Sequence, residues 1–207
     1  MALWNVPWKL APNHESLACE TALACVIKLH EMCNSHQWKQ LNLPPFYIRI
    51  GINSGIAHVG NCGSPTRFSY TAIGDAVNIA SRLQTLNKEF NTVILLSGQT
   101  YKVAKQDFVC DFVGFQTLRG RTQKVEAYSL VSNVNAASDL QKQCAQLLEQ
   151  VSSLISQPVV DYQTAIRILQ QVLEIKQNQN WNTTYVQKLI QNLQDSMFTG
   201  QHLASIS

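Results

Sequence analysis

Hydrophobic positions recur with two different periods over the first 131 residues, and they predict a mixture of helices and strands. Between Asn13 and Trp38 apolar residues return every three or four positions, which predicts one long helix with a buried face. From Tyr47 to Asn53 three isoleucines alternate with other residues, which predicts a strand with one covered face. The same analysis predicts further strands at 1–6, 68–73, 92–96, 108–118 and 124–131.

A second helix is predicted to begin at a Gly-Asp turn, with Asp75 as its N-cap. Asn78 and Arg82 are four residues apart in it, so they share a face, which is separate from the apolar stripe. An amide both donates and accepts hydrogen bonds, and a guanidinium is a permanent planar cation. Such a pair can orient a sugar or ring oxygen and neutralise charge on a phosphoryl group, although the spacing alone is more typical of a solvated helix face. The predicted apolar stripe consists of Ile79, Leu83 and Leu86.

The composition and the hydrophobic period of the sequence change after Val131. Residues 132–138 are small and polar and are predicted to form a linker. Three helical segments are predicted in the tail at 139–207, at about 139–155, 161–177 and 183–197. This tail resembles a tetratricopeptide hairpin, and a simple amphipathic bundle explains the pattern equally well.

Composition excludes several classes of function. A net charge of +3 and the lack of a Lys/Arg cluster argue against binding to nucleic acid or to an anionic membrane. No apolar run reaches the length of about 18 residues that suggests a transmembrane helix. The six cysteines form no C-x-x-C pair, which argues against zinc and redox motifs. We therefore expect reduced thiols and a cytoplasmic location. A longer parent protein that contains this chain could still be attached to a membrane.

The run from Arg49 to Arg82 contains the densest set of unusual residues. It includes RIGINSG at 49–55, VGN at 59–61 and YTAIGDAVNIASRL at 70–83. These motifs resemble those of the catalytic domain of the class III adenylate/guanylate cyclases. LRGR at 118–121 and residues 125–130 resemble the closing hairpin of that family, and MALW at 1–4 resembles the strand after its second metal site. The resemblance covers about residues 1–131.

The resemblance implies an α+β fold at 1–131, with a ferredoxin-like core in which helices pack on an antiparallel-rich sheet. The first two strands of the family pattern are not matched in this sequence. One of them normally lies inside the sheet, so its loss would expose backbone and apolar surface. We therefore expect the isolated chain to be marginally stable.

The resemblance also implies roles for four residues. Asn78 would position the ribose, and Arg82 would stabilise the pentavalent transition state. Arg119 stands where the family usually has a lysine that contacts the terminal phosphates, and arginine changes the donor geometry. Thr71 stands at a purine-contacting position, where threonine favours ATP over GTP.

The family carries two Mg²⁺ or Mn²⁺ ions, held by two aspartates in segments that this sequence does not match. In the reaction the ribose 3′-hydroxyl attacks the α-phosphate, and pyrophosphate leaves. Asp75 is the nearest acid to the predicted site, but an N-cap explains it better, so we assign no metal ligand in this chain.

Three hypotheses follow from this sequence. The chain is a fragment of an ordinary homodimeric cyclase, or it is one half of a split site whose partner brings the metals. In the third, it is a non-catalytic relic that binds another protein through its tail or through the arm at 60–67. For the first two, the partners are ATP or GTP and a second cyclase domain, in an enzyme of intracellular signalling, with the isolated chain inactive.

Overall fold

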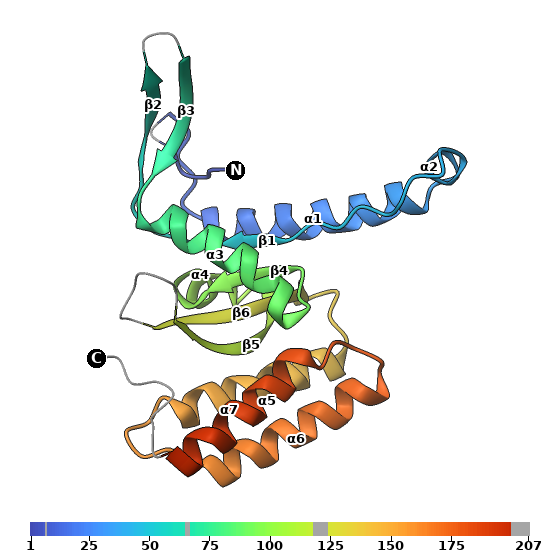
Figure 1. Ribbon diagram of the computed structural model, residues 1–207, viewed down its shortest axis with the longest axis vertical. Coiled ribbons are helices and arrows are strands. Elements are labelled where there is room, and N and C mark those ends of the chain that lie inside the picture. Colours follow the sequence, from blue (N-terminus) through green and yellow to red (C-terminus); the bar gives the residue numbers. More distant parts are fainter. Residues whose placement is uncertain (7, 65–66, 118–123, 200–207) are drawn as a thin grey trace.

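The protein was analysed as a computed structural model that describes residues 1–6, 8–64, 67–117 and 124–199. Figure 1 shows a central sheet with helices packed against it, two long projections on one side and a layer of helices on the other. Within the described ranges no helix combines the length and apolar character that a bilayer crossing requires. All six cysteines are free thiols, as expected.

The central sheet has four strands in the order β1-β4-β6-β5. Strand β1 is parallel to β4, and the other two pairings are antiparallel, so the sheet is antiparallel-rich as predicted. The inner strand β4 is buried on both faces, and helix α3 (Asp75–Phe90) packs on it. The strands are β1 (Ile50–Ile52), β4 (Ile94–Ser97), β5 (Phe108–Thr117) and β6 (Lys124–Asn133).

The N-terminal residues differ from the predicted strand. Residues 1–6 form no strand, and Val6 makes only an isolated bridge to Lys9. Asn5 adopts a left-handed conformation, and its side chain accepts a hydrogen bond from the backbone of Ala11. The chain therefore turns back on itself here instead of extending as a strand.

The predicted long helix is divided in two. Helix α1 (His14–Asn34) ends before Ser35, which has extended backbone angles and caps the short helix α2 (His36–Gln40). The expected buried face also extends over only the first half of α1. Ala18, Cys19 and Ala22 are buried, whereas Cys25 and Met32 are exposed, because the second half of α1 projects away from the sheet (Figure 1).

The second projection is a hairpin formed by β2 (His58–Ser64) and β3 (Arg67–Ile73). It extends beyond the body of the protein (Figure 1). Trp8 packs edge-on against Tyr70 of β3, with 5.2 Å between the ring centroids. Of the segment 60–67, which was expected to be either an arm or a simple hairpin loop, residues 60–64 and 67 lie in the strands of this projecting hairpin, and residues 65–66 lie outside the described residues.

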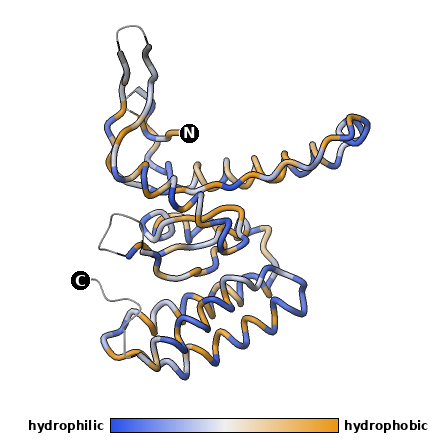
Figure 2. Tube along the Cα trace, viewed as in Figure 1, coloured by the Kyte–Doolittle hydropathy of each residue, from blue (hydrophilic) through white to orange (hydrophobic). Residues whose placement is uncertain are grey.

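The tail forms α5 (Asp139–Ile155), α6 (Tyr162–Asn178) and α7 (Thr184–Thr199), close to the predicted segments. Ser138 and Gln141 make a capping box at the start of α5. Hydrophobic residues recur along these helices (Figure 2), and α5 packs against β5. The apolar faces of the tail and the sheet meet in one core cluster. The division into a domain at 1–131, a linker at 132–138 and a tail stays a prediction, although β6 continues to Asn133.

Candidate functional site on helix α3

Helix α3 (Asp75–Phe90) carries the predicted catalytic pair. Its N-cap lies one residue before the predicted N-cap, Asp75. Its N-cap is Gly74, whose φ of +155° is at the limit of the region that favours glycine. Asp75 is instead the first helical residue, where its charge complements the helix dipole. Asp75 already takes part in an interaction within the chain, which agrees with a structural role.

The RIGINSG segment explains how α3 is held against the sheet. A Cβ added to Gly51 would lie 2.1 Å from the backbone oxygen of Ala80, so only glycine allows β1 and α3 to approach this closely. Asn53 donates a hydrogen bond from Nδ2 to the backbone oxygen of Ala76, at 3.0 Å. These two residues position the first half of α3.

Asn87 fixes the second half of the helix. It is fully buried, and its Nδ2 donates to the backbone oxygen of Ile50 in β1 at 2.9 Å. Its Oδ1 accepts a hydrogen bond from Thr92 Oγ1 at 2.8 Å, so both ends of the buried amide are satisfied. The orientation of α3 on the sheet is therefore defined by hydrogen bonds as well as by packing.

The predicted apolar stripe of α3 faces the core, since Ile79 and Leu83 are buried. Asn78 is exposed and Arg82 is half-buried, one turn apart on a neighbouring face. Neither side chain makes a hydrogen bond or ion pair with any described residue. Within the described part of the chain, the amide and the guanidinium therefore have no polar partner.

The other two predicted contacts are placed differently. Thr71 is half-buried in β3, opposite Gly60, and this strand leads directly into α3. Arg119 lies outside the described residues. The structure thus places Asn78 and Arg82 on one face of α3, and Thr71 lies in β3, the strand that precedes this helix.

The described residues do not fit a metal site. They contain no group of three or more His, Cys, Asp or Glu side chains that could hold a metal ion.

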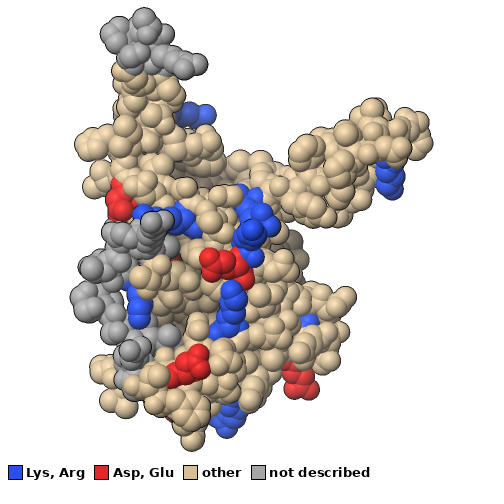
Figure 3. Space-filling view, in the orientation of Figure 1, with Lys and Arg blue, Asp and Glu red and all other residues tan. Residues whose placement is uncertain are grey.

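In Figure 3 acidic and basic side chains lie over the body of the protein, whereas the two projections present few charges on this face.

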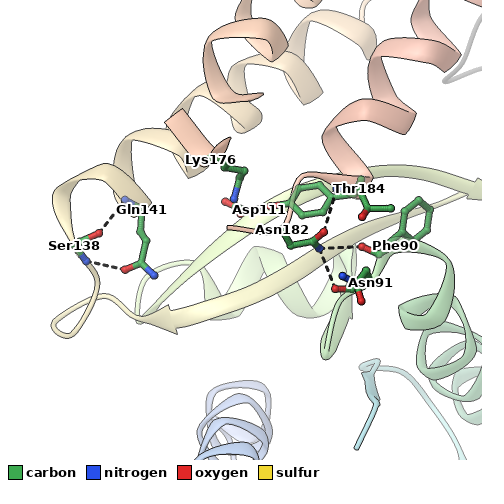
Figure 4. A network of polar contacts seen from close by, with 9 residues as sticks. Phe90, Asn91, Asp111, Ser138, Gln141, Lys176, Asn182 and Thr184 are labelled. Carbon is green, nitrogen blue, oxygen red and sulfur yellow. Dashed lines mark hydrogen bonds and ion pairs between the residues drawn. The ribbon is translucent and has the colours of Figure 1, made fainter. Parts of the chain in front are cut away.

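The sequence analysis missed a buried ionic cluster between the sheet and the tail. Lys176 of α6 donates to Asp111 Oδ2 of β5 at 2.8 Å, and these residues are only 5% and 2% exposed (Figure 4). The hydroxyl of Tyr185 donates to the same oxygen, and Lys176 lies over the rings of Trp181 and Tyr185. Burial and then the charge of Asp111 raise the pKa of Tyr185 well above its usual value. One signal was present, since Asp111 interrupts the apolar run from Phe108 to Val113.

Comparison with known proteins identifies the family. Residues 1–132 match the family described as "Adenylate and Guanylate cyclase catalytic domain". The chain therefore belongs to the class III nucleotide cyclases, and the predicted family is confirmed.

Individual relatives agree with this result. The chain is 38% identical over 137 residues to "Adenylate cyclase 1" of Rhizobium meliloti (strain 1021), covering 66% of this chain and 20% of that protein. It is 29% identical over 153 residues to "Adenylate cyclase, terminal-differentiation specific" of Dictyostelium discoideum, covering 70% of this chain and 7% of that protein. The chain thus spans only a small part of these relatives.

A solved structure supports the fold. The adenylyl cyclase CyaB from P. aeruginosa aligns with a TM-score of 0.51 at 28% identity, over 64% of this chain and 66% of that chain. The predicted α+β cyclase fold is therefore confirmed.

Proposed function

We propose that this chain supplies the nucleotide-positioning side of a class III cyclase active site. The site converts ATP, in preference to GTP, to the 3′,5′-cyclic nucleotide and pyrophosphate, for intracellular signalling. The observation that carries the proposal is the pair of Asn78 and Arg82, which lie one turn apart on α3 and make no hydrogen bond or ion pair with any described residue. Both residues lie within the part of the chain that matches the family. Thr71 contacts the purine, and Arg119 contacts the terminal phosphates.

In this proposal Asn78 holds the ribose so that its 3′-oxygen lies in line with the α-phosphorus. A new O3′–P bond forms, the bond from phosphorus to the pyrophosphate oxygen breaks, and the hydroxyl proton passes to solvent water. Negative charge is spread over the phosphoryl oxygens during this exchange. The guanidinium of Arg82 donates hydrogen bonds to these oxygens, and a fixed cation in a half-buried place stabilises the transition state.

The family's two Mg²⁺ or Mn²⁺ ions shield phosphate charge when they are bound. The described residues of this chain do not fit them. We propose that carboxylates from a preceding segment or from a partner domain hold these ions, and that the isolated chain is inactive.

A second cyclase domain is the proposed partner, either another copy of this chain or a related domain. Large apolar side chains are exposed on the stretch that follows α2 and on the stretch that leads into β2. Tyr47 is 84% exposed and Ile56 is 93% exposed, and Phe46 and Leu41 are exposed as well. Clusters of this kind are typical of surfaces that another protein covers.

A complementation assay tests the proposal. The chain is mixed with a cyclase domain that retains its metal-binding aspartates but has lost its own Asn/Arg pair, and cyclic AMP is measured. We expect activity only in the mixture, and a loss of roughly 10³-fold for Arg82→Ala. Lys88→Ala, which removes an exposed cation from the same helix, is the matched control and should leave the rate unchanged.

Two results contradict the proposal. The first is full activity of the Arg82→Ala variant in the mixture. The second is a stable complex that forms no cyclic nucleotide under any mixing, which would favour a non-catalytic interaction module.

A further inference from the structure

The C-terminal end of α3 is held by a residue of the tail. Asn182 lies between α6 and α7, and its Nδ2 donates to the backbone oxygens of Phe90 at 2.9 Å and Asn91 at 3.0 Å (Figure 4). The last carbonyls of a helix have no donor within the helix itself. The tail therefore supplies donors that the end of α3 lacks.

The same amide also stabilises the start of α7. Asn182 Oδ1 accepts a hydrogen bond from the backbone nitrogen of Thr184, the first residue of α7, at 3.0 Å (Figure 4). A helix C-terminus carries partial negative charge, and a helix N-terminus carries partial positive charge. One side chain thus joins the two helix ends with its donor and its acceptor in the matching directions.

Two further contacts restrict the segment that carries Asn182. Lys188 of α7 lies over the ring of Phe90 at 5.0 Å from its centroid, which places a cation near the end of α3. Just before Asn182, the backbone nitrogen of Trp181 donates to the oxygen of Lys176 at 2.8 Å. Because Lys176 is paired with Asp111 of β5, the connection between α6 and α7 is fixed to the sheet.

Phe90 is eight residues beyond Arg82, which is about 12 Å along a helix that rises 1.5 Å per residue. A change of tilt at the end of α3 would therefore move the face that carries Asn78 and Arg82. We propose that Asn182 is a positioning residue for the nucleotide contacts, acting through the end of α3. The inference rests on the proposed function for its effect on activity.

Asn182→Asp separates the two roles of the side chain. The variant keeps an acceptor for Thr184, and aspartate is as good at a helix start as asparagine. It loses the donors to Phe90 and Asn91 and brings a negative charge to their oxygens. Asn192→Asp adds the same charge at an exposed position of α7 and is the matched control.

The first readout is backbone hydrogen exchange of the full 207-residue chain. A net loss on the order of one hydrogen bond to a helix end corresponds to roughly tenfold faster exchange of the amides at 87–92. We expect this change in Asn182→Asp and not in Asn192→Asp. Equal exchange of these amides in the wild-type chain and in Asn182→Asp would overturn the inference.

The second readout is a double-mutant cycle in the complementation assay. We expect Asn182→Asp to lower the rate about tenfold in the wild-type background, and less than about threefold in the Arg82→Ala background, because the effect passes through Arg82. A residue that only keeps the chain folded would lower both rates by the same factor, and that result would overturn the inference. Absence of cyclase activity in the wild-type mixture would overturn the proposed function, and hydrogen exchange alone would then decide whether Asn182 holds α3.

Discussion

Arg82 and Lys176 are both cations on helices of this protein, but of the two only Lys176 has an anionic partner among the described residues. Lys176 is buried against Asp111, Tyr185 and Trp181, where the tail meets the sheet. Arg82 is half-buried on α3, beside an exposed amide, and makes no ion pair with any described residue. The comparison shows that the cation buried between the tail and the sheet is held by an internal anion, whereas the cation on α3 has no such anion among the described residues.

Removing the buried cation should have the largest effect on stability. Lys176→Met leaves the Asp111 carboxylate buried without its cation, which costs about 3–5 kcal/mol of unfolding free energy. Urea unfolding measures this loss. Lys102→Met removes an exposed cation and should change stability by less than about 0.5 kcal/mol.

Neutralising the partner sharpens that result. Asp111→Asn in the Lys176→Met background should recover at least half of the lost stability, since no buried charge remains unpaired. If the double variant is as unstable as the single one, charge pairing is not what Lys176 contributes.

The close approach of β1 and α3 should be the next most sensitive feature. Gly51→Ala places a Cβ against the backbone of Ala80, and we expect a loss of about 2–3 kcal/mol because backbone must move. Gly60→Ala is the control, because a Cβ there meets nothing within 4 Å. Thermal unfolding of the two variants would reveal the difference, and equal midpoints would show that α3 does not depend on this contact.

The buried cluster should also make the free energy of unfolding fall at alkaline pH. The pKa of Tyr185 is raised in the folded state, so the folded protein keeps a proton that the unfolded chain loses above about pH 10. The stabilisation that Tyr185 contributes is therefore complete below pH 10 and should fall by about 1.4 kcal/mol per pH unit above it. Denaturant midpoints from pH 8 to 11 test this slope, and Tyr185→Phe should reduce it. An unchanged slope in Tyr185→Phe would assign the effect to other groups.

The smallest expected effect is on the preference for ATP over GTP, to which Thr71 is proposed to contribute. Thr71→Cys should shift the ratio of kcat/KM for GTP over ATP by about tenfold in the complementation assay, or about 1.4 kcal/mol. Ser69→Cys adds a thiol at an exposed position of the same strand and should leave the ratio unchanged. Equal ratios for the Thr71 and Ser69 variants would remove Thr71 from the site.

Local patterns in the sequence predicted much of what this comparison uses. The apolar stripe of α3 depends on residues close in sequence and is as predicted. The capping of the short helix α4 (Gly98–Ala104) by Ser97 is equally local. The pairing of Asp111 with Lys176, 65 residues apart, could not be predicted, because periodicity carries no information on which helix meets which strand. The exposed end of α1 was missed for the same reason, since an apolar face does not specify what covers it. The roles of Asn78, Arg82, Thr71 and Arg119 came from motif resemblance and stay predictions.

The most direct test measures Arg82→Ala and Lys176→Met side by side, each for cyclase rate in the complementation mixture and for unfolding free energy in urea. The account predicts a crossed result. Arg82→Ala loses roughly 10³-fold in rate and less than about 0.5 kcal/mol in stability, whereas Lys176→Met loses several kcal/mol in stability and, per folded molecule, less than about tenfold in rate. An Arg82→Ala protein that retains its rate, or that loses stability as heavily as Lys176→Met, would contradict the assignment of the open helix face to nucleotide chemistry.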